Sequence, residues 1–258
     1  MSERAPQALT EKIAIITGGG KGIGRGIVDR FLAAGARVAI AQRSPLDDHL
    51  AAHDDVLAIA ADLADPDVLP EVVARTVERF GGLDVVVNNA GIMFERDLDD
   101  LTLDDWQRMM ALNVTTPVFL AKAALPHLRA RGGGAIVNIG STEGLFSNPG
   151  HIAYSASKGA IHGLTRAMAV DLGADGIRIN AIAPGWISSD LSDTYLESFG
   201  DVETANARLL NLHPAGRIGR PTDVGDLAVF LAGDGAGFLT GETIVLDGGR
   251  TVKLSSPA

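Results

Sequence analysis

Tyr154 and Lys158 are the two residues of this sequence whose types and spacing most directly indicate chemistry. They stand four positions apart, and in a helix this spacing places a phenol and an ammonium group on one face, one turn apart. A free phenol titrates near pH ~10, so holding it ionised at pH 7 takes roughly 3 pK units, or about 4 kcal/mol. A neighbouring ammonium supplies part of that stabilisation. The pair predicts a proton-transfer site, with an ordinary surface pair as the alternative.

A glycine-rich turn lies near the N-terminus, between an apolar run and an amphipathic segment. Residues 17–24 read TGGGKGIG, a TGxxxGxG pattern, and no placement of GxGxxG fits there. Glycines allow a pyrophosphate to approach the backbone closely, and a helix N-terminus offers free N–H groups and a positive dipole end. The turn therefore predicts a dinucleotide phosphate site, with a glycine loop of no function as the alternative.

Short apolar runs alternate with longer amphipathic ones along the whole chain, which is typical of βαβ units and a parallel sheet. The predicted strands are residues 12–17, 37–41, 56–60, 83–88, 134–139, 177–182 and 243–246. The predicted helices are residues 22–34, 66–80, 103–131 with a break at 113–117, 153–172 and 222–233. The strand runs are apolar throughout, so helices should cover both faces of the sheet.

Length and composition predict a single α/β domain over residues 1–258, a doubly wound parallel sheet of about seven strands. The net charge of −10 and the absence of a basic stripe argue against a nucleic-acid partner. Without cysteines, and with no metal-binding histidine spacing, no metal site is expected. The first ten residues lack an apolar signal region, and no stretch approaches about 18 uncharged apolar residues. We expect a cytoplasmic protein with no membrane partner.

Several further motifs resemble the short-chain dehydrogenase/reductase family in type and order. They are Asn88-Asn89-Ala90-Gly91 after the fourth strand, Asn113 within the long helix, Ser141 after the fifth strand, the Tyr154 and Lys158 pair, and Pro184-Gly185 after the sixth strand. Ser141 precedes Tyr154 by thirteen residues, the separation that the family shows. The resemblance covers roughly residues 12–249. It implies a Rossmann-type fold and NAD(P)-dependent hydride transfer between an alcohol and a ketone.

The resemblance also implies roles for four catalytic residues. Tyr154 would exchange a proton with the substrate oxygen, in both reaction directions. Lys158 would lower the pKa of Tyr154 and hold the hydroxyls of the nicotinamide ribose. Ser141 would hydrogen-bond the substrate oxygen and stabilise its developing charge. Asn113 would hold a water that links Lys158 to solvent.

The end of the second strand bears on the choice between NADP and NAD. An acidic residue there usually selects NAD, because it binds the ribose hydroxyls and repels a 2′-phosphate. Here Gln42 occupies that place, followed by Arg43, and Lys21 lies in the glycine turn. Two cations could therefore flank a ribose phosphate, and a guanidinium pairs with two of its oxygens at once. We expect NADP(H) to be favoured over NAD(H), with solvated surface charges as the alternative.

By the same resemblance, other residues are expected to contact the cofactor. Gly18, Gly20, Gly22, Ile23 and Gly24 would hold its phosphates, Asp62 and Leu63 its adenine, Asn89, Ala90 and Gly91 the adenine-side ribose, and Pro184, Gly185, Ile187 and Ser189 the nicotinamide, together with Tyr154 and Lys158.

Residues close to the catalytic positions are candidates for substrate contact. Glu143 is unusual, since the family tends to present small or apolar side chains two positions after the serine. A carboxylate there accepts from hydroxyls or pairs with an amine, which favours a sugar or polyol derivative; a solvated rim residue is the alternative. His151 is a further candidate, although a surface histidine is the simpler interpretation. Trp186 and a segment at residues 188–214, including Tyr195, Leu196 and Phe199, would cover the nicotinamide, or else form a subunit contact.

Three hypotheses follow for function. The first is an alcohol dehydrogenase or carbonyl reductase acting on a secondary alcohol or ketone. The second is a 3-oxoacyl-carrier-protein reductase, whose acidic partner would need a basic patch at the pocket mouth; Arg129 and Arg131 are candidates. The third is a non-catalytic protein that senses a dinucleotide, against which intact Ser141, Tyr154 and Lys158 argue. The resemblance further implies a homotetramer.

Overall fold

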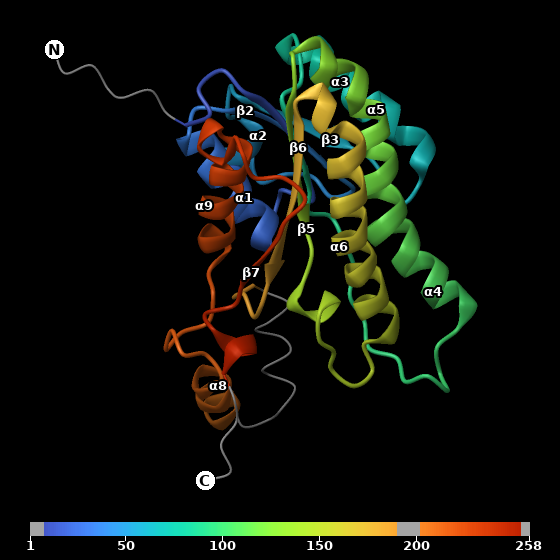
Figure 1. Ribbon diagram of the computed structural model, residues 1–258, viewed down its shortest axis with the longest axis vertical. Coiled ribbons are helices and arrows are strands. Elements are labelled where there is room, and N and C mark those ends of the chain that lie inside the picture. Colours follow the sequence, from blue (N-terminus) through green and yellow to red (C-terminus); the bar gives the residue numbers. More distant parts are fainter. Residues whose placement is uncertain (1–7, 190–201, 254–258) are drawn as a thin grey trace, which may run out of the picture.

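The seven strands of the molecule form one sheet, and every neighbouring pair is parallel. The computed structural model describes residues 8–189 and 202–253 (Figure 1). The sheet order is β3-β2-β1-β4-β5-β6-β7. The strands are β1 (Ile13–Thr17), β2 (Arg37–Gln42), β3 (Val56–Ala60), β4 (Val85–Asn88), β5 (Gly134–Ile139), β6 (Ile177–Pro184) and β7 (Thr243–Leu246). The predicted α/β class and doubly wound sheet are confirmed.

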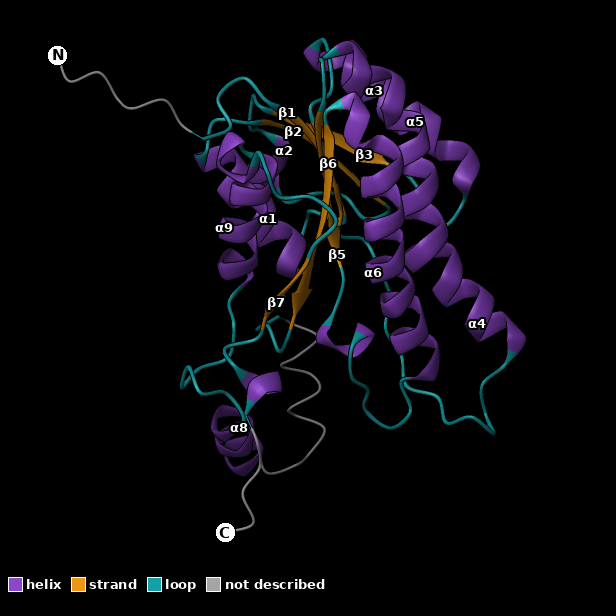
Figure 2. Cartoon of the chain, in the orientation of Figure 1, coloured by secondary structure: helices purple, strands orange, loops and turns teal. Residues whose placement is uncertain are grey.

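Helices cover both faces of this sheet, as the apolar strands require (Figure 2). Helices α1, α2 and α9 lie on one face and α3, α4, α5 and α6 on the other, while α8 lies beyond the ends of β6 and β7. The bounds are α1 (Gly22–Ala33), α2 (Asp48–Ala51), α3 (Leu69–Phe80), α4 (Leu103–Met110), α5 (Thr116–Ala130), α6 (Ile152–Leu172), α8 (Val202–Asn211) and α9 (Pro221–Ala232).

Strand β1 shows how the sequence builds two cores. Ala14 and Ile16 pack with α1 and α9, whereas Ile13 and Ile15 pack with α3 and α5. Successive side chains of a strand point to opposite faces, so an unbroken apolar run buries both. All five β1 residues are buried.

The long helix predicted over residues 103–131 is interrupted where the sequence indicated. A π-helical turn, Ala111–Thr115, separates α4 from α5 and carries Asn113, which is buried. Pro117 follows immediately and has no N–H to continue the regular ladder. By length and composition, Leu103–Ala130 is apolar enough to cross a membrane. In the fold its apolar side chains Leu120, Ala124 and Leu128 belong to the core between α3, α6 and the sheet, which accounts for this composition.

Other predicted boundaries differ by one to three residues, and two helices of the described residues, α2 and α8, were not predicted. The residues before α3 form a 3-10 turn, Pro66–Val68, instead of the first turn of an α-helix. The single-turn helix α2 is too short to show a periodicity. Helix α8 lies inside residues 188–214, where no regular element was expected. Residues 190–201, including Tyr195, Leu196 and Phe199, lie outside the described residues.

The topology fixes where a ligand can bind. Chain order reverses between β1 and β4, so the turns that follow these two strands diverge and leave a crevice at their carboxyl ends. The glycine turn follows β1, Asn89-Ala90-Gly91 follows β4, and Ser141 follows β5. The motifs singled out from the sequence therefore meet at one edge of the sheet.

Candidate active site

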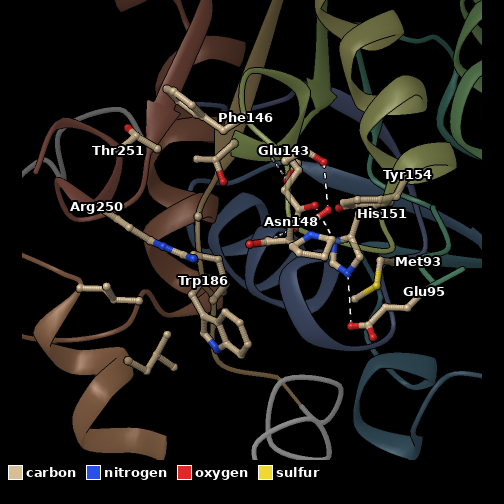
Figure 3. Close-up of a pocket in the computed structure, with 18 of the residues that line it drawn as sticks. Met93, Glu95, Glu143, Phe146, Asn148, His151, Tyr154, Trp186, Arg250 and Thr251 are labelled. Atoms are coloured by element: carbon tan, nitrogen blue, oxygen red, sulfur yellow. Dashed lines mark hydrogen bonds and ion pairs between the residues drawn. The ribbon is translucent and has the colours of Figure 1, made fainter. Parts of the chain in front are cut away.

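A cavity of about 910 Å³ opens at the carboxyl ends of β5 and β6. Ser141, Tyr154, Ile23 and Trp186 all contribute to its wall, so the first turn of α1 and the α6 phenol face the same space. Figure 3 shows Tyr154, Glu143 and His151 grouped on one side of this cavity, with Trp186 and Arg250 on the other. A volume of this size accommodates a small molecule and part of a cofactor.

Tyr154 and Lys158 lie one turn apart on α6, with the Lys158 Nζ 5.7 Å from the centre of the tyrosine ring. The pKa of Tyr154 is raised to about 12, mainly by burial and also by the negative charge of Glu143, while a hydrogen bond with Ser141 acts in the opposite direction. In the protein by itself the net shift of this pKa is upward, so Lys158 does not bring the phenol below its ordinary value. The physical reason is that both groups are deeply buried, and that Lys158 Nζ donates to the Ile139 carbonyl at 2.8 Å.

Burial also lowers the pKa of Lys158 to about 8. Between that value and the ordinary value near pH 10.5, the unfolded chain holds a proton that the folded chain has released. The free energy of unfolding should consequently rise with pH across this window, by about 3 kcal/mol. We expect urea unfolding curves from pH 8 to 10 to show this rise in the wild type and to lack it in Lys158→Met. Parallel pH profiles of the two proteins would contradict it.

Ser141 lies at the end of β5, beside Tyr154. Its hydroxyl accepts a hydrogen bond from the Glu143 N–H at 3.1 Å and caps the short 3-10 turn Thr142–Gly144. The same hydroxyl hydrogen-bonds Tyr154. This side chain therefore has both the structural role of a cap and a position from which it can donate to a substrate oxygen.

Asn113 is held firmly by its surroundings. Its Oδ1 accepts from the Ile92 N–H at 2.9 Å, and its Nδ2 donates to the Ile92 carbonyl and to the Ser157 hydroxyl, each at 3.0 Å. Ser157 precedes Lys158, so Asn113 joins the π-helical turn to α6. Gly91 packs here too, because a Cβ at that position would lie 3.1 Å from Asn113 Oδ1 and 3.8 Å from Lys158 Nζ.

The glycine turn has the geometry of an anion cradle. A Cβ on Gly24 would lie 2.0 Å from the Gly18 carbonyl oxygen, so the start of α1 lies directly against the turn. Asn89 Nδ2 donates to the carbonyls of Thr17 and Gly18 at 2.9 and 3.0 Å, which fixes the turn to the end of β4. Helix α1 has no acidic residue in its first turn and no side-chain cap from Lys21. Its N–H groups and dipole thus suit the phosphates of a dinucleotide.

Gln42 occupies the end of β2, as expected, and contacts the same turn. Its Oε1 accepts from the Gly20 N–H at 2.8 Å, while its Nε2 donates to the Ser44 carbonyl. Arg43, which follows Gln42, and Lys21, in the glycine turn, are both exposed. Asp62 caps its own loop through the Ala64 N–H at 3.2 Å, and Leu63 is buried. Both follow β3, on the Gln42 side of the crevice.

Asn89, Ala90 and Gly91 were expected to contact the same ribose, but in the structure they lie against different groups. Asn89 and Ala90 donate through their backbone N–H groups to Thr17 Oγ1, each at 2.9 Å, beside the glycine turn. Gly91 instead lies next to Lys158. Pro184 is the last residue of β6, and Gly185, Ile187 and Ser189 follow it along the cavity wall.

An ion-pair network surrounds Glu143. His151 Nδ1 lies 2.5 Å from one Glu143 oxygen, and Asn148 Nδ2 donates to the other at 3.0 Å. His151 Nε2 lies 3.2 Å from Glu95 Oε1. Burial lowers the pKa of His151, but the hydrogen bonds and charges of the two carboxylates outweigh it, so the net shift is upward. The interpretation of His151 as a surface residue is wrong: it is 7% exposed.

Glu95 and Asn148 were not predicted from the sequence. Glu95 stands 56 residues before His151, in the loop after β4, and reaches it because Arg96 and Gly150 are joined by a backbone hydrogen bond of 2.8 Å. No local motif marks this pairing. The Glu143 side chain is only 18% exposed, so it is not a freely solvated rim residue.

Two arginines considered for a pocket mouth lie elsewhere. Arg129 and Arg131 close α5 and precede β5, so they lie at the amino ends of the strands, whereas the cavity lies at the carboxyl ends. Arg129 pairs with Asp175 at 2.7 Å and Arg131 with Asp84 at 2.9 Å. The expectation of a basic patch formed by these residues is wrong. In the described ranges, no group of three or more possible metal ligands gathers.

Known proteins share this architecture over almost the whole chain. A family model described as enoyl-(acyl carrier protein) reductase matches residues 18–251. The 2-(R)-hydroxypropyl-CoM dehydrogenase of Xanthobacter autotrophicus is 38% identical, over 93% of this chain and 98% of its own. The 3-oxoacyl-[acyl-carrier-protein] reductase of Synechocystis is 34% identical, over 95% and 99%.

Among solved structures, the ligand-free aldohexose dehydrogenase of Thermoplasma acidophilum superposes with a TM-score of 0.90 at 29% identity, covering 98% of this chain and all of that one. The fold, the order of motifs at one sheet edge and these matches agree. The chain belongs to the short-chain dehydrogenase/reductase family.

Proposed function

We propose that this NAD(P)-dependent oxidoreductase interconverts a secondary alcohol and its ketone on a sugar or polyol derivative, with NADP(H) as the favoured cofactor. The observation that carries the proposal is the convergence of Ser141, Tyr154 and the partly buried Glu143 on one cavity, which the first turn of α1 also lines. When bound, the nicotinamide supplies or accepts the hydride. The side chains of the protein position the substrate and transfer its proton.

Tyr154 is the acid/base in this proposal. With a pKa of about 12 it is protonated at neutral pH, the form that can donate to an oxygen becoming an alkoxide. Ser141 lies beside it and would share the developing negative charge. Lys158 would hold ribose hydroxyls, and Gly91, where a Cβ would lie 3.8 Å from Lys158 Nζ, would lie beside the same ribose. Asn113 would serve as a positioning residue for the catalytic helix and for a water near Lys158.

Glu143 supports the choice of a hydroxylated substrate. Asn148 and His151 fix its carboxylate, yet each oxygen retains a lone pair that can accept from a substrate hydroxyl. A fixed acceptor close to Tyr154 would orient a second hydroxyl next to the reacting carbon. Trp186 and Leu209 would form the apolar cover of the site, and we assign residues 188–214 to the substrate-binding segment because Ser189, Thr204 and Leu212 also line the cavity.

The preference for NADP(H) rests on Arg43 and Lys21 beside a neutral Gln42. We expect Arg43→Ala to raise the Kd for NADP⁺ by about 10- to 100-fold, and that for NAD⁺ by less than about threefold, because a charge-assisted hydrogen bond to the 2′-phosphate is lost. Titration calorimetry with both dinucleotides measures the two constants. Arg75→Ala, on α3 away from the crevice, is the matched control. Equal losses for both dinucleotides would show that Arg43 does not select.

A substrate screen tests the activity itself. Nicotinamide absorbance would be followed with both cofactors over sugars, polyols, simple ketones and acyl thioesters. Oxidation of polyols or sugars supports the proposal. Reduction of 3-oxoacyl thioesters alone would favour the second candidate, a 3-oxoacyl-carrier-protein reductase, which the similar Synechocystis enzyme suggests. Dinucleotide binding with no turnover of any class would favour a sensing protein.

We further propose a cytoplasmic homotetramer. Large apolar side chains are exposed on the helices of one face, with Leu103 71%, Phe119 43% and Val170 83% exposed. Burial of such side chains against other copies of the chain would remove an unfavourable contact with water. Light scattering after size exclusion would give the number of copies directly.

A further inference from the structure

The cavity has two ends with different charges. Glu143, Glu95 and His151 lie on the side that holds Tyr154, and Arg250 lies on the other side. Arg208 of α8 also lines the cavity. In Figure 3, Arg250 extends from its turn toward the middle of the cavity, next to Trp186 and across from Tyr154. Tyr154 and Arg250 therefore face one cavity from opposite sides.

At the Tyr154 end, the positive charge of His151 partly compensates those of two carboxylates. Both Glu143 oxygens have partners, Asn148 Nδ2 and His151 Nδ1, and the second ring nitrogen of His151 faces Glu95. An ionised carboxylate only accepts hydrogen bonds, so both ring contacts are hydrogen bonds when His151 carries two ring protons and a positive charge. The two carboxylates at this end of the cavity therefore already have a counter-ion, His151.

The arginines at the other end lack such compensation. Elsewhere in this acidic chain, Arg25, Arg129 and Arg217 each have a carboxylate oxygen within 3 Å. Across the described ranges, Arg208 and Arg250 are in no ion pair. Asp247 is close to Arg250 in sequence, but its two oxygens accept from the N–H groups of Gly249 at 2.9 Å and Thr251 at 2.7 Å.

The backbone that carries Arg250 is fixed rather than loose. Asp247 Oδ2 accepts from the Thr251 N–H within the 3-10 turn Arg250–Val252. Gly248 and Gly249 adopt the left-handed conformation that leads into this turn, with φ of 63° and 84°. The Gly248 carbonyl accepts from the Ala215 N–H at 3.0 Å, and Lys253 Nζ donates to the Asn211 carbonyl at the end of α8. The turn with Arg250 is thus joined to the helix with Arg208.

We propose that Arg250 and Arg208 bind an anionic group of the substrate, a carboxylate or a phosphate, at the end of the cavity opposite Tyr154. The inference rests on the proposed function and narrows its substrate class to sugar acids, sugar phosphates and similar anionic hydroxy compounds. A guanidinium matches the planar carboxylate and the phosphate oxygens through paired hydrogen bonds. The hydroxyl that reacts would then lie at Tyr154 while the anion anchors the far end.

Matched substrates test this site. Sorbitol, gluconate and sorbitol 6-phosphate share a hydroxylated six-carbon chain, and they differ in the neutral, carboxylate or phosphate end. We expect kcat/KM to be higher for at least one anion than for sorbitol, and to fall about tenfold or more in Arg250→Gln, mainly through KM. In Arg250→Gln, kcat/KM for sorbitol should stay within about twofold of the wild-type value. Arg208→Gln should show a smaller loss of the same kind, and Arg75→Gln, on α3, none.

A binding measurement keeps this test separate from that of the proposed function. Calorimetry on the enzyme–NADP⁺ complex gives the Kd of gluconate and of sorbitol 6-phosphate, whether or not they react. A Kd that rises about tenfold in Arg250→Gln supports the site and shows which anion it prefers. Binding of neither anion, or equal binding to wild type and variant, would overturn it, even if sorbitol is oxidised. If the anions bind in an Arg250-dependent way but no alcohol or ketone is turned over, the anion site is supported and the proposed activity is refuted.

Discussion

Replacing Tyr154 with phenylalanine is expected to lower kcat by about 10²- to 10⁴-fold, the contribution typical of a positioned general acid/base. The phenol lines the cavity beside Ser141, and its pKa is raised to about 12, so it carries its proton at neutral pH. The ring of phenylalanine fills the same space, so the packing of α6 should persist. Steady-state rates with the best substrate from the screen give the loss directly.

The dinucleotide affinity separates a chemical effect from a structural one. Tyr154→Phe should bind NADP⁺ within about threefold of the wild type, since Lys158, Gly91 and the glycine turn are untouched. Circular dichroism and the midpoint of thermal unfolding should also match. A variant that keeps turnover would refute the acid/base assignment, and one that loses both turnover and NADP⁺ binding would assign a structural role to the phenol instead.

The sheet was accessible to prediction because most of its strands, such as β1, β4 and β6, are buried on both faces. An apolar run bounded by glycine, proline or polar residues indicates such a strand without knowledge of its neighbours. β1, with all five residues buried, is the clearest case. Helices α2 and α8 gave no comparable signal: α2 is a single turn, and the mixed sequence of α8 lies in a segment that covers the cavity instead of packing in either core.

Residue types indicated the chemistry of the site's centre, but not its electrostatics. Four-residue spacing on a helix brings Tyr154 and Lys158 together whatever surrounds them. Their pKa values depend on burial, which a local pattern does not report, and burial shifts the phenol up and the ammonium down. The contact of His151 with Glu95 likewise depends on two loops that meet only in the folded chain.

Gly24→Ala should produce the second large effect, a loss of stability together with a loss of cofactor binding. The new Cβ would lie 2.0 Å from the Gly18 carbonyl oxygen and 2.5 Å from Asn89 Nδ2. The nearest of these neighbours is backbone, so α1 and the glycine turn must move apart. Such overpacking costs about 1 to 3 kcal/mol or more. Because the same shift displaces the N–H groups expected to hold the phosphates, the Kd for NADP⁺ should rise by about 100-fold or more.

Gly163→Ala is the matched control for this change. Gly163 is also a helical glycine, in α6, but a Cβ there meets nothing within 4 Å. Alanine is the better helix former by about 0.5 to 1 kcal/mol, so this variant should equal or exceed the wild type in stability and bind NADP⁺ normally. Urea unfolding and calorimetry on the two variants make the comparison. If Gly24→Ala matches Gly163→Ala in stability and in the Kd for NADP⁺, the close approach of α1 to the glycine turn is not required for either. That result would contradict the assignment of the turn as the phosphate site.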